Sequence, residues 1–176
     1  MAPPSAKANL LAGVLLSLAA LSHCEPVSGN LYLVPMEPTT DPANHIGCLD
    51  AAGRLTLDDC ETFTWEAETW TGGNLVSATA GPCTVNDESQ PTNKDAVYGG
   101  TVHALFCSQD AAPDTQFYTV NGLDGRLCQG NLRCAWDIPI TGKPAPDDQV
   151  LVWPFVWGSQ QMGVPEGHTQ VALYLQ

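Results

Sequence analysis

Tryptophan rings are the side chains of this chain best suited to holding a ligand by its face. Sugar recognition places an aromatic ring against the apolar side of a pyranose and uses polar groups for the hydroxyls. Trp70 precedes Thr71-Gly72-Gly73, so we expect it at the edge of a turn with its ring exposed. Trp65 alternates with Phe63 and is expected in the core, as is most of the apolar segment 153–157. Trp70 is therefore the candidate binding residue.

Closely spaced carboxylates occur at Asp58-Asp59 with Glu61 and at Asp147-Asp148. A glycosidase needs two carboxylates that face one bond. Neighbours on a strand point to opposite faces, and acids in turns are normally solvated. These acids are therefore expected to be structural or solvated and to carry no catalysis.

The histidines of the region after residue 24 are scattered through the sequence, at His45, His103 and His168. No Ser-His-Asp arrangement can be inferred from them, and no G-x-S-x-G motif occurs. C-x-x-C pairs and D-x-D-x-D-G loops are also absent from the sequence. We therefore expect no catalytic residues, no metal site and no cofactor.

Six cysteines lie in the region after residue 45, with a seventh at Cys24. An even number of cysteines in an oxidising compartment predicts disulfides, although the sequence leaves their connectivity open. Sequential pairing is the simplest arrangement, and each bond would close a local loop. It gives Cys48–Cys60, Cys83–Cys107 and Cys128–Cys134.

Composition narrows the class of protein. The chain has 176 residues, 6 Lys and Arg against 19 Asp and Glu, a net charge of −13 and 44% hydrophobic residues. The hydrophobic fraction supports one folded domain with a core. The acid excess argues against nucleic acid as a partner, because phosphate contacts need clustered Lys and Arg.

The first 22 residues are predicted to be a signal peptide. Lys7 precedes an apolar run from Leu10 to Leu21, and Ala20 and Ser22 form a small-x-small cleavage site. The sequence contains no further hydrophobic stretch of membrane length. We therefore expect a secreted, extracellular, monomeric protein that does not bind a membrane. Residues 23–45 are expected to be a lead-in to a single β-domain over residues 46–176.

Short apolar segments separated by turns dominate that domain, and residues 86–99 are expected to form a long exposed loop. Outside the signal peptide, no window has a convincing helical period. Many short strands at regular spacing predict a compact antiparallel barrel or sandwich. The expected strands lie within residues 54–57, 62–65, 74–77, 102–107, 116–120, 150–157 and 169–175.

Four stretches in the same order carry a resemblance to a known family. They are Gly47-Cys48-Leu49 with residues 59–64, then residues 77–83, then Leu105-Phe106-Cys107, and finally residues 164–170. In these the chain resembles the small C-terminal accessory β-domain of fungal secreted ribonucleases of the T-two family. Cys128 and Cys134 and the long 86–99 loop depart from that pattern. The histidine motifs of the ribonuclease catalytic domain are absent, so the resemblance implies a non-catalytic role such as attachment to wall polysaccharide.

A second resemblance leads to a different β fold. Cys48-Leu49-Asp50, the spacing to Cys60 and the segment Gln116-Phe117-Tyr118 are similar to the C-L-D and Q-x-W motifs of ricin-type β-trefoil lectins. This alternative implies one sugar site with Asp50 as its carboxylate.

The sequence thus predicts a secreted, disulfide-linked, non-catalytic module that binds polysaccharide. The alternatives are a structural or effector protein that binds another secreted protein, and a trefoil lectin.

Overall fold

The computed structural model describes residues 25–38, 40–69, 72–96, 102–119, 125–130, 134–155 and 163–176. Its elements are twelve strands and one short 3₁₀ turn. In chain order they are β1 (Val27–Pro35), η1 (Pro42–Asn44), β2 (Gly47–Leu49), β3 (Leu55–Thr56), β4 (Thr62–Thr69), β5 (Gly72–Ser77), β6 (Gly81–Thr84), β7 (Phe106–Cys107), β8 (Phe117–Thr119), β9 (Arg126–Gln129), β10 (Trp136–Ile138), β11 (Trp153–Pro154) and β12 (Thr169–Leu175).

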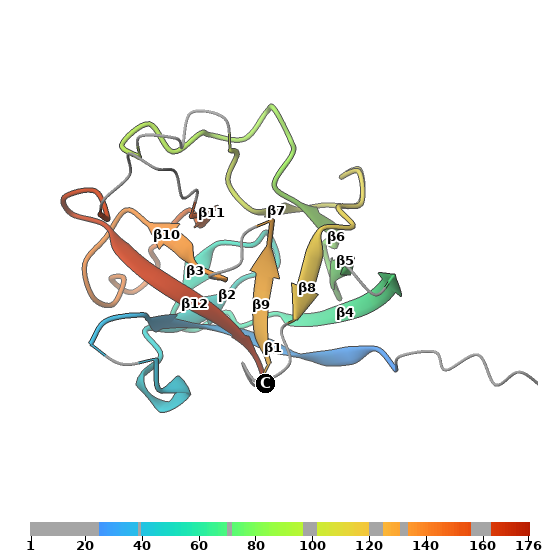
Figure 1. Cartoon of the computed structure of the whole chain (residues 1–176), viewed down its shortest axis with the longest axis horizontal. Helices are drawn as coiled ribbons and strands as arrows, with labels where there is room; N and C mark the ends of the chain where they lie inside the picture. The colour runs from blue at the N-terminus through green and yellow to red at the C-terminus, as the bar shows by residue number, and fades with distance from the viewer. Residues whose placement is uncertain are drawn as a thin grey trace, which may run out of the picture.

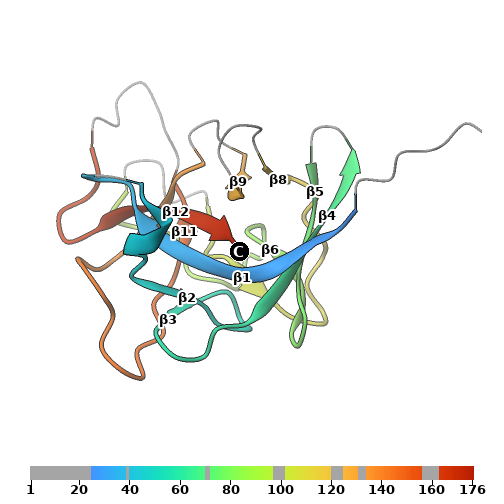
Figure 2. The same ribbon diagram turned by 90° about the horizontal axis from the view of Figure 1, so that it is seen from below.

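Six of these strands close an antiparallel barrel (Figures 1 and 2). Around the barrel the order is β1, β4, β5, β8, β9 and β12, and β12 pairs again with β1. In the β1–β12 pairing that closes the barrel, Leu31 faces Leu175 and Pro35 faces Val171. The all-β antiparallel barrel expected from the sequence is confirmed.

The other six strands form three pairs, β2–β3, β6–β7 and β10–β11. The three pairs are joined by backbone hydrogen bonds from Cys107 to Ala52, from Leu105 to Val152 and from Leu55 to Val150. Each consecutive set of four strands thus gives two strands to the barrel and one pair to a three-part cap. This is the connectivity of a β-trefoil, the alternative that the lectin-like motifs indicate.

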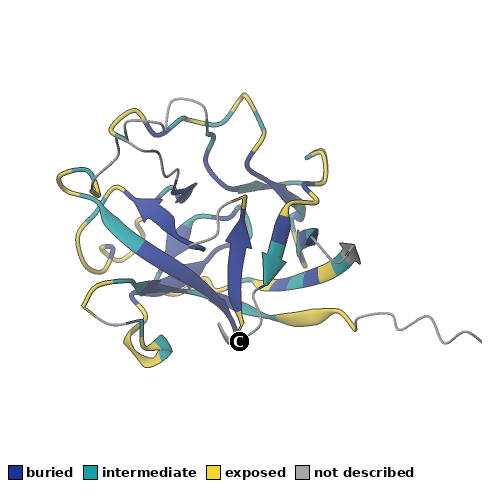
Figure 3. Cartoon of the chain, in the orientation of Figure 1, coloured by how far each residue is buried: buried dark blue, intermediate teal, exposed yellow. Residues whose placement is uncertain are grey.

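Side chains that alternate along the barrel strands fill its interior. On β12, Val171, Leu173 and Leu175 belong to the main core, whereas Ala172 and Tyr174 pack on the outer face in a second cluster. Figure 3 shows burial concentrated on the strands and exposure on the connecting loops. The fully buried side chains of the main core include Leu31, Leu33, Phe63, Leu75, Phe117, Leu127 and Trp136.

Three disulfides follow the sequential pairing expected from the sequence: Cys48–Cys60, Cys83–Cys107 and Cys128–Cys134. Each bond lies within one set of four strands. In the chain-entropy view each restricts the unfolded chain and contributes about 2–4 kcal/mol to stability. Disulfides persist in oxidising environments, which fits an extracellular location. No helix in the described part of the chain is long and apolar enough to cross a membrane.

The expected domain boundary at residue 46 is too late. Residues 27–35, within the predicted lead-in, form β1, which contacts β12, β2 and β4. Leu31, Leu33 and Val34 are completely buried. The barrel cannot close without this strand, so the domain includes it.

The expectation of a solvated loop over residues 86–99 is also only partly right. Within its described part, residues 86–96, Asn93 is buried, and Trp153 Nε1 donates to the carbonyl of Pro91 at 3.0 Å. The backbone of Ala104 also donates to Pro91. We call residues 86–96 the inserted segment. It packs against the cap rather than lying free.

Candidate functional site

An open pocket of about 510 Å³ lies on the outer face of the barrel. It is lined by Tyr32 of β1, Pro42 and Ala43 of η1, His45, and Gln176. Tyr32 is half-buried, whereas His45 and Gln176 are exposed. The Tyr32 and His45 rings lie 4.8 Å apart at 53°. The pocket therefore presents an aromatic ring, an imidazole and an amide to solvent.

Local sequence explains how η1 brings His45 to this place. Asp41 caps the turn, and its Oδ1 accepts the backbone N–H of Ala43 at 3.0 Å. Pro42 follows at the first position, where its fixed φ suits a helical turn and its missing N–H costs nothing. The backbone N–H of Ile46 then donates to Leu33, so the chain returns to β1 directly after His45.

The two barrel strands beside the pocket fix its other side. Tyr32 lies opposite Tyr174 in the β1–β12 register, on the outer face. The backbone of Gln176 exchanges two hydrogen bonds with Asn30, at 2.7 and 3.0 Å. Because both segments belong to the closed barrel, Tyr32 and Gln176 are held by a rigid frame rather than by loops.

Trp70, the candidate binding residue from the sequence, lies outside the described residues. Asp50 is described, is 7% exposed and lies in the β2–β3 turn. Its Oδ1 accepts the backbone N–H groups of Ala52 at 2.9 Å and Arg54 at 2.8 Å. Gly53 in this turn has φ of +87°, which favours glycine. Asp50 thus stabilises a turn and does not line the pocket.

The other described tryptophans are core residues, as expected for Trp65 and for the segment that contains Trp153. Trp65 is 8% exposed, Trp153 6% and Trp136 fully buried. Each indole N–H donates to a backbone carbonyl at 3.0–3.1 Å. Trp157 lies outside the described residues. These rings are therefore unavailable as a flat binding face.

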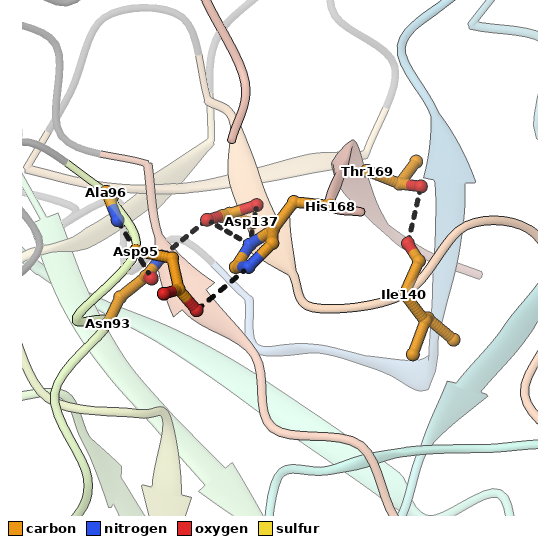
Figure 4. A network of polar contacts seen from close by, with 7 residues as sticks. All are labelled: Asn93, Asp95, Ala96, Asp137, Ile140, His168 and Thr169. Carbon is orange, nitrogen blue, oxygen red and sulfur yellow. Dashed lines mark hydrogen bonds and ion pairs between the residues drawn. The ribbon is translucent and has the colours of Figure 1, made fainter. Parts of the chain in front are cut away.

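A buried polar network joins β10, the inserted segment and the residues before β12 (Figure 4). Asp137 is completely buried, and its two carboxylate oxygens lie 3.1 and 3.0 Å from Nδ1 of His168. Asn93 donates its side-chain amide to the same carboxylate. On the other side of the ring, Nε2 of His168 lies 3.4 Å from Oδ2 of Asp95. The histidine thus lies between two carboxylates.

Burial raises the pKa of Asp137 above the ordinary value of 3.8, although His168 and Asn93 act in the opposite direction. Removing a carboxylate from water disfavours its charged form, while an adjacent imidazolium and hydrogen-bond donors favour it. Here burial is the larger effect. Asp137 consequently holds its proton more tightly in the folded protein than in the unfolded chain.

A second buried carboxylate holds the other end of the inserted segment. Asp114 is 4% exposed. It accepts the side-chain amides of Asn86 at 3.0 Å and Gln129 at 3.1 Å, together with the backbone N–H of Gln116 at 2.9 Å. Its donors among the described residues are all amides.

The carboxylates that the sequence offered for acid–base chemistry lie at the surface or serve turns. Asp58, Asp59, Asp147 and Asp148 are exposed, and Glu61 accepts two hydrogen bonds from Thr79. Among the described residues, no group of three His, Cys, Asp or Glu side chains could hold a metal ion.

Comparisons with family models, curated proteins and solved structures found no match to this chain. The two resemblances drawn from the sequence therefore stay predictions.

The residues that line the pocket were not identified as a site from the sequence. Tyr32 and His45 fell within the supposed lead-in. The alternation of Leu31-Tyr32-Leu33, followed by the turn former Asp41-Pro42, is the pattern that could have indicated a strand and an ordered turn there.

Proposed function

We propose that the protein is a secreted, non-catalytic module that binds extracellular polysaccharide, and that the pocket beside Tyr32 holds a sugar ring. The observation that carries this proposal is the pairing of an aromatic ring with polar groups in one open concave site. A pyranose offers an apolar face to Tyr32 and hydroxyls to His45 and Gln176.

The chemistry of the pocket favours a sugar over an apolar ligand or a protein surface. Among the described residues, the exposed large hydrophobic side chains are Val27 and Val164. A protein interface commonly has an aromatic or aliphatic anchor at its centre, surrounded by a larger apolar patch. Val27 lies at the start of β1, and Val164 lies in the loop before β12. They are separate in the sequence and in the fold, so they do not form an apolar patch of this kind.

Binding to a panel of soluble wall oligosaccharides, measured by calorimetry, tests this function. We expect Tyr32→Ala to weaken binding about tenfold or more, since the ring contributes its stacking area only in the complex. Tyr118→Ala is the matched control, because Tyr118 lies on β8 and does not line the pocket. Single-stranded RNA serves as a ligand that should not bind, given the net charge of −13.

Two results would contradict the proposal. If no oligosaccharide binds the intact protein, the polysaccharide function is wrong. If Trp70→Ala abolishes binding while Tyr32→Ala leaves it unchanged, the function stands but the pocket is the wrong site.

A further inference from the structure

The most unusual polar feature of the molecule is a histidine enclosed by two carboxylates from different segments. The His168 side chain is 5% exposed, Asp137 is fully buried, and Asp95 is 73% exposed at the end of the inserted segment. We infer that Asp95, His168 and Asp137 form a proton-dependent clasp that holds the inserted segment against the cap in acid and loosens it as pH rises. This inference is independent of the proposed sugar site.

Proton counting gives the direction of the effect. Closing both contacts requires a hydrogen between Nδ1 and Asp137 and another between Nε2 and Asp95. An imidazolium beside an ionised Asp137 supplies both, and so does a neutral imidazole beside a protonated Asp137. A neutral imidazole beside an ionised Asp137 supplies only one, so one carboxylate then faces a nitrogen lone pair. The closed clasp thus holds one proton more than the open one.

The group expected to leave first is Asp95. It is the exposed partner, so water replaces its hydrogen bond at little cost, whereas Asp137 has no access to solvent. The raised pKa of Asp137 acts in the same direction, because it also keeps the extra proton on the closed form.

Among the residues that the structure describes, no other buried charged side chain contacts Asp95, His168 or Asp137. Asn93 donates a neutral amide to Asp137, and the charged neighbours Lys94 and Glu166 are exposed. The middle of the inserted segment is held separately, by the bonds of Trp153 and Ala104 to Pro91 and of His103 Nδ1 to Gln90 at 2.9 Å. Opening of the clasp should therefore free residues 94–96 and leave residues 90–93 in place, because Asn93 keeps its bond to Asp137.

Hydrogen exchange of the full chain from pH 5 to pH 8, with rates corrected for the intrinsic effect of pH, tests the clasp. In the wild type, the opening equilibrium of residues 94–96 should rise with pH by up to about tenfold per unit, the limit for one proton, and by at least about tenfold overall. His168→Gln keeps one N–H donor but does not titrate, so its opening equilibrium should not depend on pH.

Two further variants keep the test decisive. Asp95→Asn alters only the exposed partner, should fold normally, and should also abolish the pH dependence. His103→Gln is the matched control, because a histidine donates to a carbonyl whether or not it is protonated, so its pH dependence should equal that of the wild type. A wild-type profile without pH dependence, or one that persists in Asp95→Asn, would overturn the inference.

Discussion

Two buried carboxylates hold the inserted segment, one near residue 86 and one near residues 93–95, and their hydrogen-bond partners differ. Near residue 86 the buried carboxylate of Asp114 accepts, among the described residues, only amide N–H groups, from Asn86, Gln129 and the backbone of Gln116. Near residues 93–95 the buried carboxylate of Asp137 accepts from the amide of Asn93 and is hydrogen-bonded to Nδ1 of His168. Both carboxylates are at least nine-tenths buried.

The difference between the two contacts lies in the donor. An amide keeps its protons throughout the range in which proteins are stable, whereas an imidazole loses one within it. When only amides donate to a carboxylate, a change of pH does not remove protons from the donors, so the contact is not weakened in this way. A carboxylate bound by an imidazole forms one that pH can weaken. The inserted segment thus has one contact, at Asp114, whose donors do not respond to pH, and one contact, at Asp137, that pH can weaken.

Removal of either carboxylate should produce the largest effects. Asp137→Ala leaves a buried histidine and a buried amide without their acceptor, and we expect a loss of about 3–5 kcal/mol in unfolding free energy. Asp114→Ala strands neutral amides only, for a loss of about 1–3 kcal/mol. Urea unfolding of both variants at pH 5 measures the two losses. Equal losses would remove the distinction between the two contacts.

The pH dependence of unfolding should separate the two contacts next. Because the pKa of Asp137 is raised in the folded state above 3.8, the folded protein holds a proton that the unfolded chain has released. The contribution of Asp137 to the free energy of unfolding should then fall as pH rises from about 4 through the raised pKa, with a slope of at most about 1.4 kcal/mol per unit.

Asp137→Asn should flatten this profile, because the amide does not titrate, while Asp114→Asn should retain it because the His168–Asp137 pair is intact. Urea titrations at half-unit intervals between pH 3.5 and 8 give the slopes. Profiles of wild type and Asp137→Asn that coincide would show that Asp137 does not link folding to protons.

The smallest effects are expected at the two asparagines. Asn93→Ala removes a buried donor from Asp137 and should cost about 1–2 kcal/mol. Asn86→Ala removes an exposed side chain whose acceptor keeps two other donors, so about 0.5–1 kcal/mol is expected. Thermal unfolding resolves the order, and a larger loss for Asn86→Ala would reverse our view of which contact is more deeply buried.

Local features of this fold could be predicted from the sequence. The alternation of Phe63 with Trp65 predicted an inward-facing strand, and both side chains are buried. The disulfides were predictable because each links cysteines close in sequence, at separations of 12, 24 and 6 residues. Trefoil-like motifs were visible at Cys48-Leu49-Asp50, but Asp50 serves its own turn.

Contacts between distant segments could not be predicted in the same way. His168 meets Asp137 from 31 residues away, and Asn93 meets it from 44. No periodicity links such positions, because the pairing of β10 with β12 and the packing of the inserted segment bring them together. The pocket was missed for the same reason: Tyr32 lies beside Gln176 only because β1 pairs with β12.

Because β1 pairs with β12, circular permutation could change the order in which the three sets of four strands follow one another along the chain. Asn30 and Gln176 are hydrogen-bonded neighbours, so a short linker would connect these two strands without distorting the barrel. Every disulfide lies inside one set of four strands, so a circular permutant opened between β8 and β9 would separate no bonded pair. Each set of four strands would keep its own disulfide whichever set came first in the chain. The fold should therefore tolerate a new N-terminus at the boundary between two sets.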